Sequence, residues 1–310
     1  MITIKSHSHD YSVETFASLA QVFKGLAETR GQYYLVDREI ERIYQKEVDA
    51  AVPENRRIVI EATEEQKSYE RLTPIFLELL SKGLKRDGTL VVVGGGVLQD
   101  IGCFIATVLF RGVRWEFVPT TLLAQSDSCI GSKSSINIGD YKNQIGTFYP
   151  PHRVMVASDV LSSLPWDEIR SGLGEVIKLQ LIAGQAGFDE LMADLKNLNP
   201  NGGKEVVQKW VERSIAVKKP YIEKDEFDRG IRNILNYGHT FGHAYESATK
   251  YAIPHGIAVI LGILTATYLS ARLGLVDESH FLDLKLRLTP WFYPYETTLL
   301  KARRDDIFKA

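Results

Sequence analysis

Short apolar runs alternate with amphipathic stretches through the first half of the 310-residue chain. The apolar runs, rich in β-branched and aromatic residues, lie at 33–36, 57–60, 89–93 and 115–118. Helical periodicity occupies the intervals at 38–48, 68–82 and 98–110. Strands that alternate with helices are typical of a parallel sheet covered by helices. The pattern therefore predicts an α/β domain for residues 1–160.

The strand pattern fades after residue 160, and helical patterns then follow one another along the chain. Pro165 with Asp167 and Glu168 marks the first helix start, because acidic residues favour a first turn. The predicted helices cover 166–182, 205–219, 236–250, 256–273 and 278–288. Residues 256–271 are uncharged but too short to span a membrane, so we expect a buried helix there. The second half is predicted to be an all-α domain, residues 161–310.

Composition narrows the class of ligand. Hydrophobic residues make up 45% and charged residues 25% of the chain, as in an ordered globular protein. The formal net charge of -2 creates no overall attraction to nucleic acid or anionic membrane. Two cysteines without paired spacing, and first residues without a secretory-signal pattern, favour the cytoplasm. We expect a cytoplasmic protein with a small-molecule ligand and no nucleic-acid or membrane partner.

Three consecutive glycines, Gly94, Gly95 and Gly96, separate a predicted buried strand from a predicted helix. Such a turn lets backbone N–H groups approach a pyrophosphate at a helix N-terminus. Gln99 replaces the last glycine of the usual dinucleotide motif, and Asp100 adds a negative charge nearby. Taken alone, the motif is equally consistent with a tight turn in an α/β sheet.

A histidine pattern in the second half indicates a metal site. His239 and His243 are four residues apart, which places both imidazoles on one helix face, and His255 follows after a short loop. Thr240 occupies the position at which a metalloprotease carries its general base. Because three histidines cluster, metal ligation is favoured over core or helix-capping histidines.

Glu175 is the candidate anionic ligand, because it lies among glycines and apolar residues where an uncompensated carboxylate is costly. Its alternative is an exposed helical residue paired with Lys178 three positions on. The sequence leaves both interpretations open.

A further group of polar residues begins in residues 126–151, where little periodicity predicts a loop suited to an anion and hydroxyl groups. The group comprises Asp127, Lys133, Lys142 and Asn143, and further on Lys218, Arg232 and Asn236. The alternative is a solvated charged surface.

Together these segments resemble the 3-dehydroquinate synthase family of sugar-phosphate cyclases. The matching stretches are GGGVLQD at 94–100, RG at 111–112, PTTLLAQSDSCIGSKSSIN at 119–137, KNQIGTFYPP at 142–151, GLGEVIK at 172–178, LNYGHTFGHAYE at 235–246 and HGIAV at 255–259. The resemblance implies a Rossmann-like NAD-binding domain, a helical domain that binds a divalent metal, and a homodimer. Zn²⁺ is the implied metal, with Co²⁺ as the alternative.

The resemblance also implies roles for individual residues. The implied metal ligands are Glu175, His239 and His255. Contacts to a sugar-phosphate substrate are implied for Asp127, Lys133, Lys142, Asn143, Lys178, Lys218, Arg232, Asn236 and His243, and Arg111 is implied to reach the phosphate held by the partner subunit. Cofactor contacts are implied for Asp37, Glu64, Lys67, Gly94, Gly95, Gly96, Asp100, Thr120 and Thr121, with Lys133 and Lys142 shared. An acid near the ribose favours NAD over NADP.

The implied activity converts 3-deoxy-arabino-heptulosonate 7-phosphate to 3-dehydroquinate and phosphate, a step of the shikimate pathway to aromatic amino acids. The chain departs from the family pattern at Ser132, at the ending of 146–151, and at Ile257, where the pattern has Glu. These departures keep open a paralogous cyclase acting on sedoheptulose 7-phosphate or another sugar phosphate. A metal-dependent alcohol or glycerol dehydrogenase and a catalytically silent homologue are less favoured. The pattern includes a basic segment beyond residue 310, so we expect a longer natural chain or one phosphate contact fewer.

Overall fold

The computed structural model describes residues 1–203, 205–302 and 304–309. The chain divides into two compact units, Met1–Leu164 and Pro165–Ala310. The sequence pattern predicts the boundary after residue 160. Unit 1 contains the sheets, whereas the regular elements described in unit 2 are helices. The predicted class, an α/β domain followed by an all-α domain, is confirmed.

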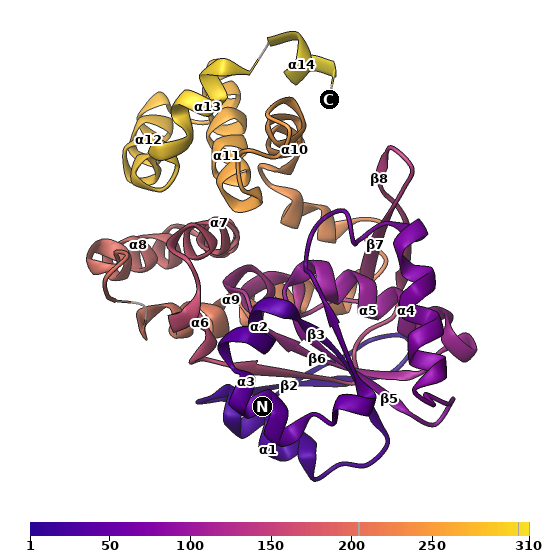
Figure 1. Ribbon diagram of the computed structural model, residues 1–310. Coiled ribbons are helices and arrows are strands. Elements are labelled where there is room, and N and C mark those ends of the chain that lie inside the picture. Colours follow the sequence, from indigo (N-terminus) through magenta and orange to yellow (C-terminus); the bar gives the residue numbers. More distant parts are fainter. Residues whose placement is uncertain (204, 303, 310) are drawn as a thin grey trace. The chain divides into compact units, whose positions relative to one another are not determined.

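A seven-stranded sheet forms the centre of unit 1, in the order β1-β2-β9-β6-β5-β3-β4 (Figure 1). Its strands are β1 Ile2–Ile4, β2 Tyr11–Phe16, β3 Gln32–Asp37, β4 Arg57–Ile60, β5 Thr89–Gly94, β6 Arg114–Pro119 and β9 Arg153–Ala157. All neighbours pair in parallel except β1 and β2. The register sets Val93 beside both Val36 and Val118, which accounts for the continuous apolar runs of strands buried on two faces. The four predicted strands correspond to β3, β4, β5 and β6.

Helices cover both faces of this sheet. They are α1 Leu19–Ala27, α2 Arg38–Ile43, α3 Gln45–Ala51, α4 Tyr69–Ser81, α5 Gly96–Val108 and α6 Val160–Ser163. Leu19 and Phe23 of α1 belong to one buried cluster with Val36, Val93 and Met155 of the strands. On α5, a Cβ at position 102 would overlap the side chain of Val92, so glycine allows this helix to approach β5 closely.

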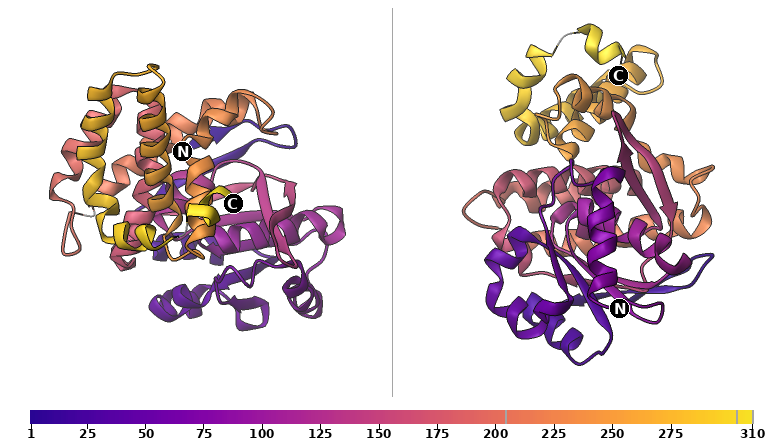
Figure 2. Two further views of the ribbon diagram at one scale, coloured as in Figure 1. Left: turned by 90° about the horizontal axis from the view of Figure 1, so that it is seen from above. Right: turned by 45° about the vertical axis from the view of Figure 1, so that its right-hand side comes forward.

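Residues 126–151 were predicted to be a loop, and this prediction is wrong. They begin inside a short π-helix, Ala124–Ser128, and contain a hairpin of β7 Lys133–Ile138 with β8 Tyr141–Phe148. Figures 1 and 2 show the hairpin standing apart from the large sheet. Most of β8 is exposed on both faces, so its sequence lacks the alternation of apolar and polar residues that indicates a half-buried strand.

Unit 2 is built from helices. They are α7 Trp166–Ala183, α8 Gln185–Asp194, α9 Glu205–Lys224, α10 His239–Ala248, α11 His255–Arg272, α12 Glu278–Phe292, α13 Glu296–Lys301 and α14 Arg304–Lys309, with a 3₁₀ helix η5 at Ile231–Asn236. α11 packs against α7, α10 and α12, and Figure 2 shows α11 beside α12. The helix predicted over 236–250 begins three residues late, because Gly238 adopts a left-handed conformation with φ of 81°.

The contact between α7 and α11 depends on two glycines. A Cβ on Gly174 would overlap the carbonyl of Gly256, and a Cβ on Gly256 would overlap the carbonyl of Ser171. The Gly256 N–H also donates to the Ser171 hydroxyl at 3.3 Å. The two helices therefore meet backbone to backbone.

The central helix α11 is long and apolar enough to cross a membrane by length and composition, the one such helix in the part of the chain that the structure describes. However, 56% of this stretch is buried inside the protein, as in the core helix of a globular domain. The predicted buried helix at 256–271 is confirmed.

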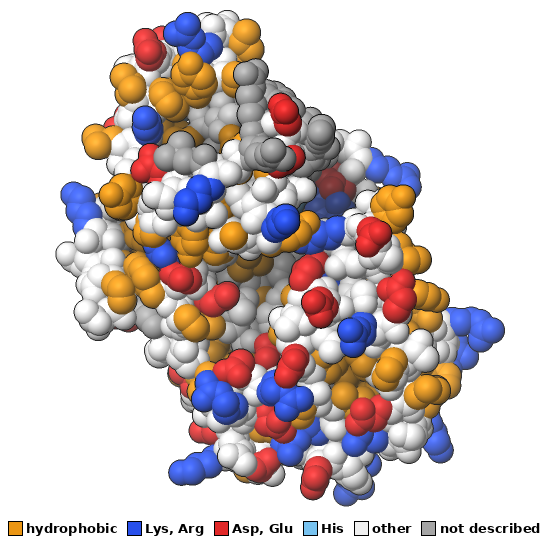
Figure 3. All heavy atoms as spheres, turned by 45° about the horizontal axis from the view of Figure 1, so that its top comes forward, with side chains coloured by type: hydrophobic (Ala, Val, Ile, Leu, Met, Phe, Trp, Pro, Cys, Tyr) orange, Lys and Arg blue, Asp and Glu red, His pale blue; other side chains and the backbone are white. Residues whose placement is uncertain are grey.

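Lys, Arg, Asp and Glu side chains are interspersed on the face in Figure 3, in keeping with the net charge of -2.

Two stacked imidazoles join the N-terminal segment to the start of β9. The rings of His9 and His152 lie 3.8 Å apart between centroids, and the Trp115 N–H donates to His152 Nδ1 at 3.4 Å. Burial, with the charges of His9 and Arg114, lowers the pKa of His152 to about 4.

The low pKa of His152 makes unit 1 sensitive to acid. Below about pH 6.5 the unfolded chain binds a proton at this residue, whereas the folded chain does so only near pH 4. The free energy of unfolding therefore falls as pH drops through this window, by about 1–2 kcal/mol between pH 7 and pH 5 after allowance for partial exposure. Urea midpoints of the unchanged protein and His152→Asn should show a shallower pH slope for the variant. Equal slopes would contradict the assignment.

Candidate functional site

Glu175, His239 and His255 come together within unit 2 from three helices. Glu175 lies in the middle of α7, His239 begins α10, and His255 begins α11. Glu175 Oε1 is 3.1 Å from His255 Nε2 and 3.6 Å from His239 Nε2. One ligand atom from each residue lies within 4.8 Å of the others, so the three could hold one metal ion.

The carboxylate of Glu175 is 1% exposed and forms an ion pair with Lys178 Nζ at 2.5 Å. The pairing weighed from the sequence therefore exists, but in the interior rather than on an exposed helix face. Burial opposes ionisation, but Lys178 and the two imidazoles hold the pKa of Glu175 well below its ordinary value. The site thus presents an ionised oxygen ligand beside two nitrogen ligands.

A second carboxylate, Glu246, reaches the same cluster. Its Oε1 lies 3.2 Å from His255 Nδ1, and its Oε2 lies 2.8 Å from His243 Nδ1. Although burial disfavours the charged imidazole, the bonds to Glu175 and Glu246 raise the pKa of His255 to about 10. A bound divalent cation could supply the positive charge that these carboxylates stabilise. Sequence reasoning missed Glu246, although its position three residues after His243 on one helix face was the available signal.

Three cations of unit 2 that are predicted to contact the substrate are buried rather than solvated. Lys178 is 2% exposed, Lys218 on α9 is 7% exposed, and Arg232 on η5 is 8% exposed. Arg232 donates to the backbone carbonyl of Glu226. α7, α9 and η5 pack against one another, whereas Asn236 at the end of η5 is exposed. Buried cations on adjacent elements are suited to bind an anion.

In unit 1 the structure joins five of the predicted residues in one polar network. Lys67 Nζ lies 3.1 Å from Asp100 Oδ2 and 2.9 Å from Asn143 Oδ1. Glu64 Oε1 lies 3.5 Å from Lys67 Nζ and 3.6 Å from Lys142 Nζ. Burial raises the pKa of the Asp100 carboxyl, although Lys67 and the Ser135 N–H and hydroxyl oppose that rise.

A second set of predicted residues in unit 1 lies at or just after the ends of strands β3, β5 and β6. Asp37 caps α2, since its Oδ1 accepts the Glu39 N–H at 3.0 Å, and burial raises its pKa. Gly94, Gly95 and Gly96 form the turn from β5 into α5, where a Cβ on Gly95 would lie 2.9 Å from Thr121. Thr120 and Thr121 follow β6, and the Thr120 N–H donates to the Gly94 carbonyl at 3.0 Å.

Three further predicted residues of unit 1 lie on other elements. Asp127 lies in the π-helix at Ala124–Ser128, and Lys133 begins β7 with an exposed side chain. Arg111 is exposed and has a φ of 65° in the turn after α5. Their implied roles remain predictions.

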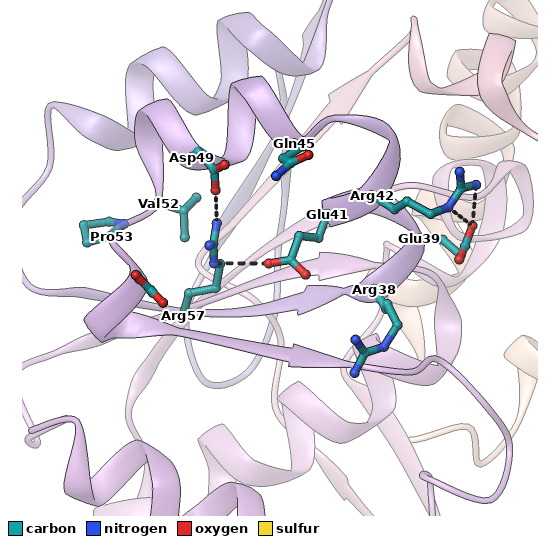
Figure 4. A pocket seen from close by; sticks show the side chains of 10 residues that line it. Arg38, Glu39, Glu41, Arg42, Gln45, Asp49, Val52, Pro53 and Arg57 are labelled. Carbon is teal, nitrogen blue, oxygen red and sulfur yellow. Dashed lines mark hydrogen bonds and ion pairs between the residues drawn. The ribbon is translucent and has the colours of Figure 1, made fainter.

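Unit 1 also has a surface cavity of about 760 Å³ between α2, α3 and β4 (Figure 4). Arg57 lies between two carboxylates, with its Nη1 2.8 Å from Asp49 Oδ1 and its Nε 3.4 Å from Glu41 Oε1. Arg42 forms an ion pair with Glu39. The charges that line the cavity largely compensate one another, and none of the predicted site residues lines it.

The sequence matches two models of one protein family. The family model for the 3-dehydroquinate synthase N-terminal domain matches residues 57–171, and that for the C-terminal domain matches residues 172–309. The chain belongs to the 3-dehydroquinate synthase family. This confirms the predicted resemblance. Homologues of this name are enzymes, and a cyclase that eliminates phosphate is a carbon–oxygen lyase, so this is the enzyme class of the chain.

Curated members of the family align over most of the chain. The 3-dehydroquinate synthase of Alkaliphilus metalliredigens is 36% identical over 85% of this chain and 77% of its own length. That of Acidithiobacillus ferrooxidans is 44% identical over 76% of this chain and 65% of its own length. Among solved structures, 2-deoxy-scyllo-inosose synthase complexed with carbaglucose-6-phosphate, NAD⁺ and Co²⁺ has a TM-score of 0.83 at 24% identity, over 99% of this chain and 85% of that chain. This last likeness supports the fold alone.

Proposed function

We propose that the protein is a 3-dehydroquinate synthase, which converts 3-deoxy-arabino-heptulosonate 7-phosphate to 3-dehydroquinate and phosphate with NAD and a divalent metal. The observation that carries the proposal is the group of Glu175, His239 and His255, whose ligand atoms lie within 4.8 Å of one another. The curated relatives at 36 and 44% identity favour this substrate over those of the paralogous cyclases.

The metal site fits a divalent cation by its donor chemistry. Two imidazoles and one carboxylate are a ligand set found in catalytic zinc sites, and Zn²⁺ is the metal we propose, with Co²⁺ as the alternative. When bound, the metal lowers the pKa of a coordinated hydroxyl, and NAD accepts and returns a hydride. Lys178 offsets the charge of Glu175 and keeps its carboxylate ionised in the interior.

The cofactor contacts proposed for unit 1 follow the strand ends. The turn at Gly94–Gly96 brings backbone N–H groups to the start of α5, where a pyrophosphate binds favourably. The carboxylate of Asp37 suits the ribose hydroxyls of NAD and would repel the extra phosphate of NADP. The other cofactor contacts that we propose are Glu64, Lys67, Asp100, Thr120, Thr121, Lys133 and Lys142.

The substrate's anionic groups need cations that hold them without covalent chemistry. Lys218 and Arg232 are buried cations that would bind these anionic groups and orient the substrate. His243 donates from Nδ1 to Glu246, which leaves Nε2 as the nitrogen that faces a phosphate and holds or moves a proton. We assign substrate contacts also to Asp127, Lys133, Lys142, Asn143, Lys178 and Asn236, and to Arg111 in the partner subunit of a cytoplasmic homodimer.

Phosphate release tests the proposed function directly. The Zn²⁺- and NAD-loaded protein is expected to release phosphate from 3-deoxy-arabino-heptulosonate 7-phosphate with no net rise in NADH absorbance, because the hydride returns in each turnover. A chelator should stop the release, and Zn²⁺ or Co²⁺ should restore it.

Parallel assays with sedoheptulose 7-phosphate and glucose 6-phosphate separate the alternatives. Release from one of these alone would indicate a paralogous cyclase, the alternative that the departures at Ser132 and Ile257 keep open. Net NADH formation from an alcohol would indicate a dehydrogenase. Light scattering of the eluted protein tests the homodimer.

A further inference from the structure

Glu246 lies between two imidazoles of the proposed site and engages one with each oxygen. Its Oε2 is 2.8 Å from His243 Nδ1, and its Oε1 is 3.2 Å from His255 Nδ1. The two rings stack with centroids 5.8 Å apart and an interplanar angle of 27°. Glu246 itself is 8% exposed, whereas the His243 side chain is 61% exposed, so the bond to His255 is the better shielded from water.

This arrangement determines which nitrogen of each ring is available. An ionised carboxylate only accepts hydrogen bonds, so both Nδ1 atoms must donate to it. Each Nε2 then lies on the far side of its ring from Glu246. For His255 this is the nitrogen 3.1 Å from Glu175 Oε1, in the proposed metal site. Ligating histidines commonly hydrogen-bond a carboxylate through the other ring nitrogen, which fixes tautomer and orientation.

We propose that Glu246 is a positioning residue that orients His255 toward the metal and His243 toward the substrate at once. The inference rests on the proposed function and extends it, because one side chain then links metal affinity to substrate binding. Ile257, which stands where the family pattern has a glutamate, is fully buried and offers no acceptor. Glu246 on α10 therefore supplies the carboxylate that orients the His255 ligand.

A competing explanation is that Glu246 ligates a second ion. Ligand atoms of His243, Glu246 and His255 also lie within 4.8 Å of one another. However, His255 would then have to give both ring nitrogens to metals and lose its last proton, which neutral imidazole holds tightly. The orienting role requires no such loss, and the stoichiometry of metal binding separates the two explanations.

Co²⁺ binding tests the inference with a readout other than activity. The unchanged protein, Glu246→Gln and Glu246→Asp are titrated with Co²⁺ against a competing chelator, and the visible spectrum of bound Co²⁺ is recorded. Glu212→Gln, an exposed position on α9, is the matched control. We expect one Co²⁺ per chain, affinity lowered about 10–100-fold and an altered spectrum in Glu246→Gln, partial recovery in Glu246→Asp, and no change in the control.

The outcomes separate this inference from the proposed function. One ion bound equally tightly by the unchanged protein and Glu246→Gln would overturn the positioning role alone. A lower melting temperature in Glu246→Gln with an unchanged Co²⁺ affinity and spectrum would show a purely structural role and also overturn it. Two ions per chain, with one lost in Glu246→Gln, would make Glu246 a ligand instead. No Co²⁺ on the unchanged protein would refute the proposed function and this inference together.

Discussion

Glu175→Gln is expected to abolish metal binding and to destabilise unit 2 strongly. The substitution removes an anionic ligand and leaves Lys178, 2% exposed, as a buried cation without its carboxylate. Removing one partner of a buried ion pair costs about 3–5 kcal/mol, which corresponds to a melting temperature lower by roughly 10 °C. Phosphate release should fall by at least about 100-fold, since even partners of the ligands contribute 10–100-fold. Calorimetric melting and a phosphate assay measure the two effects.

The double variant Glu175→Gln with Lys178→Met separates stability from chemistry. Replacing both members of a buried pair with uncharged groups is often neutral, so the melting temperature should largely recover while metal binding and phosphate release stay absent. Activity in the double variant would exclude Glu175 as a ligand. An unchanged melting temperature in the single variant would show that Lys178 does not depend on this carboxylate.

Gly256→Ala is the second substitution with a large expected effect. The added methyl group would overlap the Ser171 carbonyl, so α7 and α11 must move apart. Overpacking of this kind costs about 1–3 kcal/mol, and backbone contact on both sides leaves little room for adjustment. The movement also separates Glu175 from His255, now 3.1 Å apart, so the affinity for Co²⁺ should fall about 10-fold or more.

Gly25→Ala is the matched control for this change. Gly25 lies in α1 with nothing within 4 Å of a Cβ, so alanine should stabilise that helix by about 0.5–1 kcal/mol. Metal affinity should not change. If Gly256→Ala melted and bound Co²⁺ like the unchanged protein, the close contact of α7 and α11 would not be required for the site.

The central strands and helices are predictable because burial imposes a clear pattern on them. Strand β5 is buried on both faces and α11 over most of its length, and their sequences are accordingly apolar. The β7–β8 hairpin escaped prediction because β8 is mostly exposed and needs no such pattern. The candidate metal ligands could be proposed from the sequence because His239 and Glu175 belong to recognisable local sequences, and the structure brings these two residues together with His255.

Contacts between distant segments could not be inferred in the same way. Gly256 appeared only as part of a motif, and its need for backbone contact with Ser171 requires the packing of two helices. Glu246 likewise appeared only within the matching stretch at 235–246, because its bond to His255 crosses from α10 to α11. The Lys67–Asp100 pair joins positions 33 residues apart, and no local spacing indicates it.

The backbone contact between Ser171 and Gly256 also bears on how the protein reaches its native state. These residues are 85 positions apart, so the proposed ligands Glu175 and His255 meet only after a long stretch of chain has closed. His239 and His243, in contrast, approach each other within a single helical turn. Excess zinc that is present during refolding could therefore bind this local pair before α7 packs against α11. We expect a higher yield of native protein when the metal is added after the helices have packed.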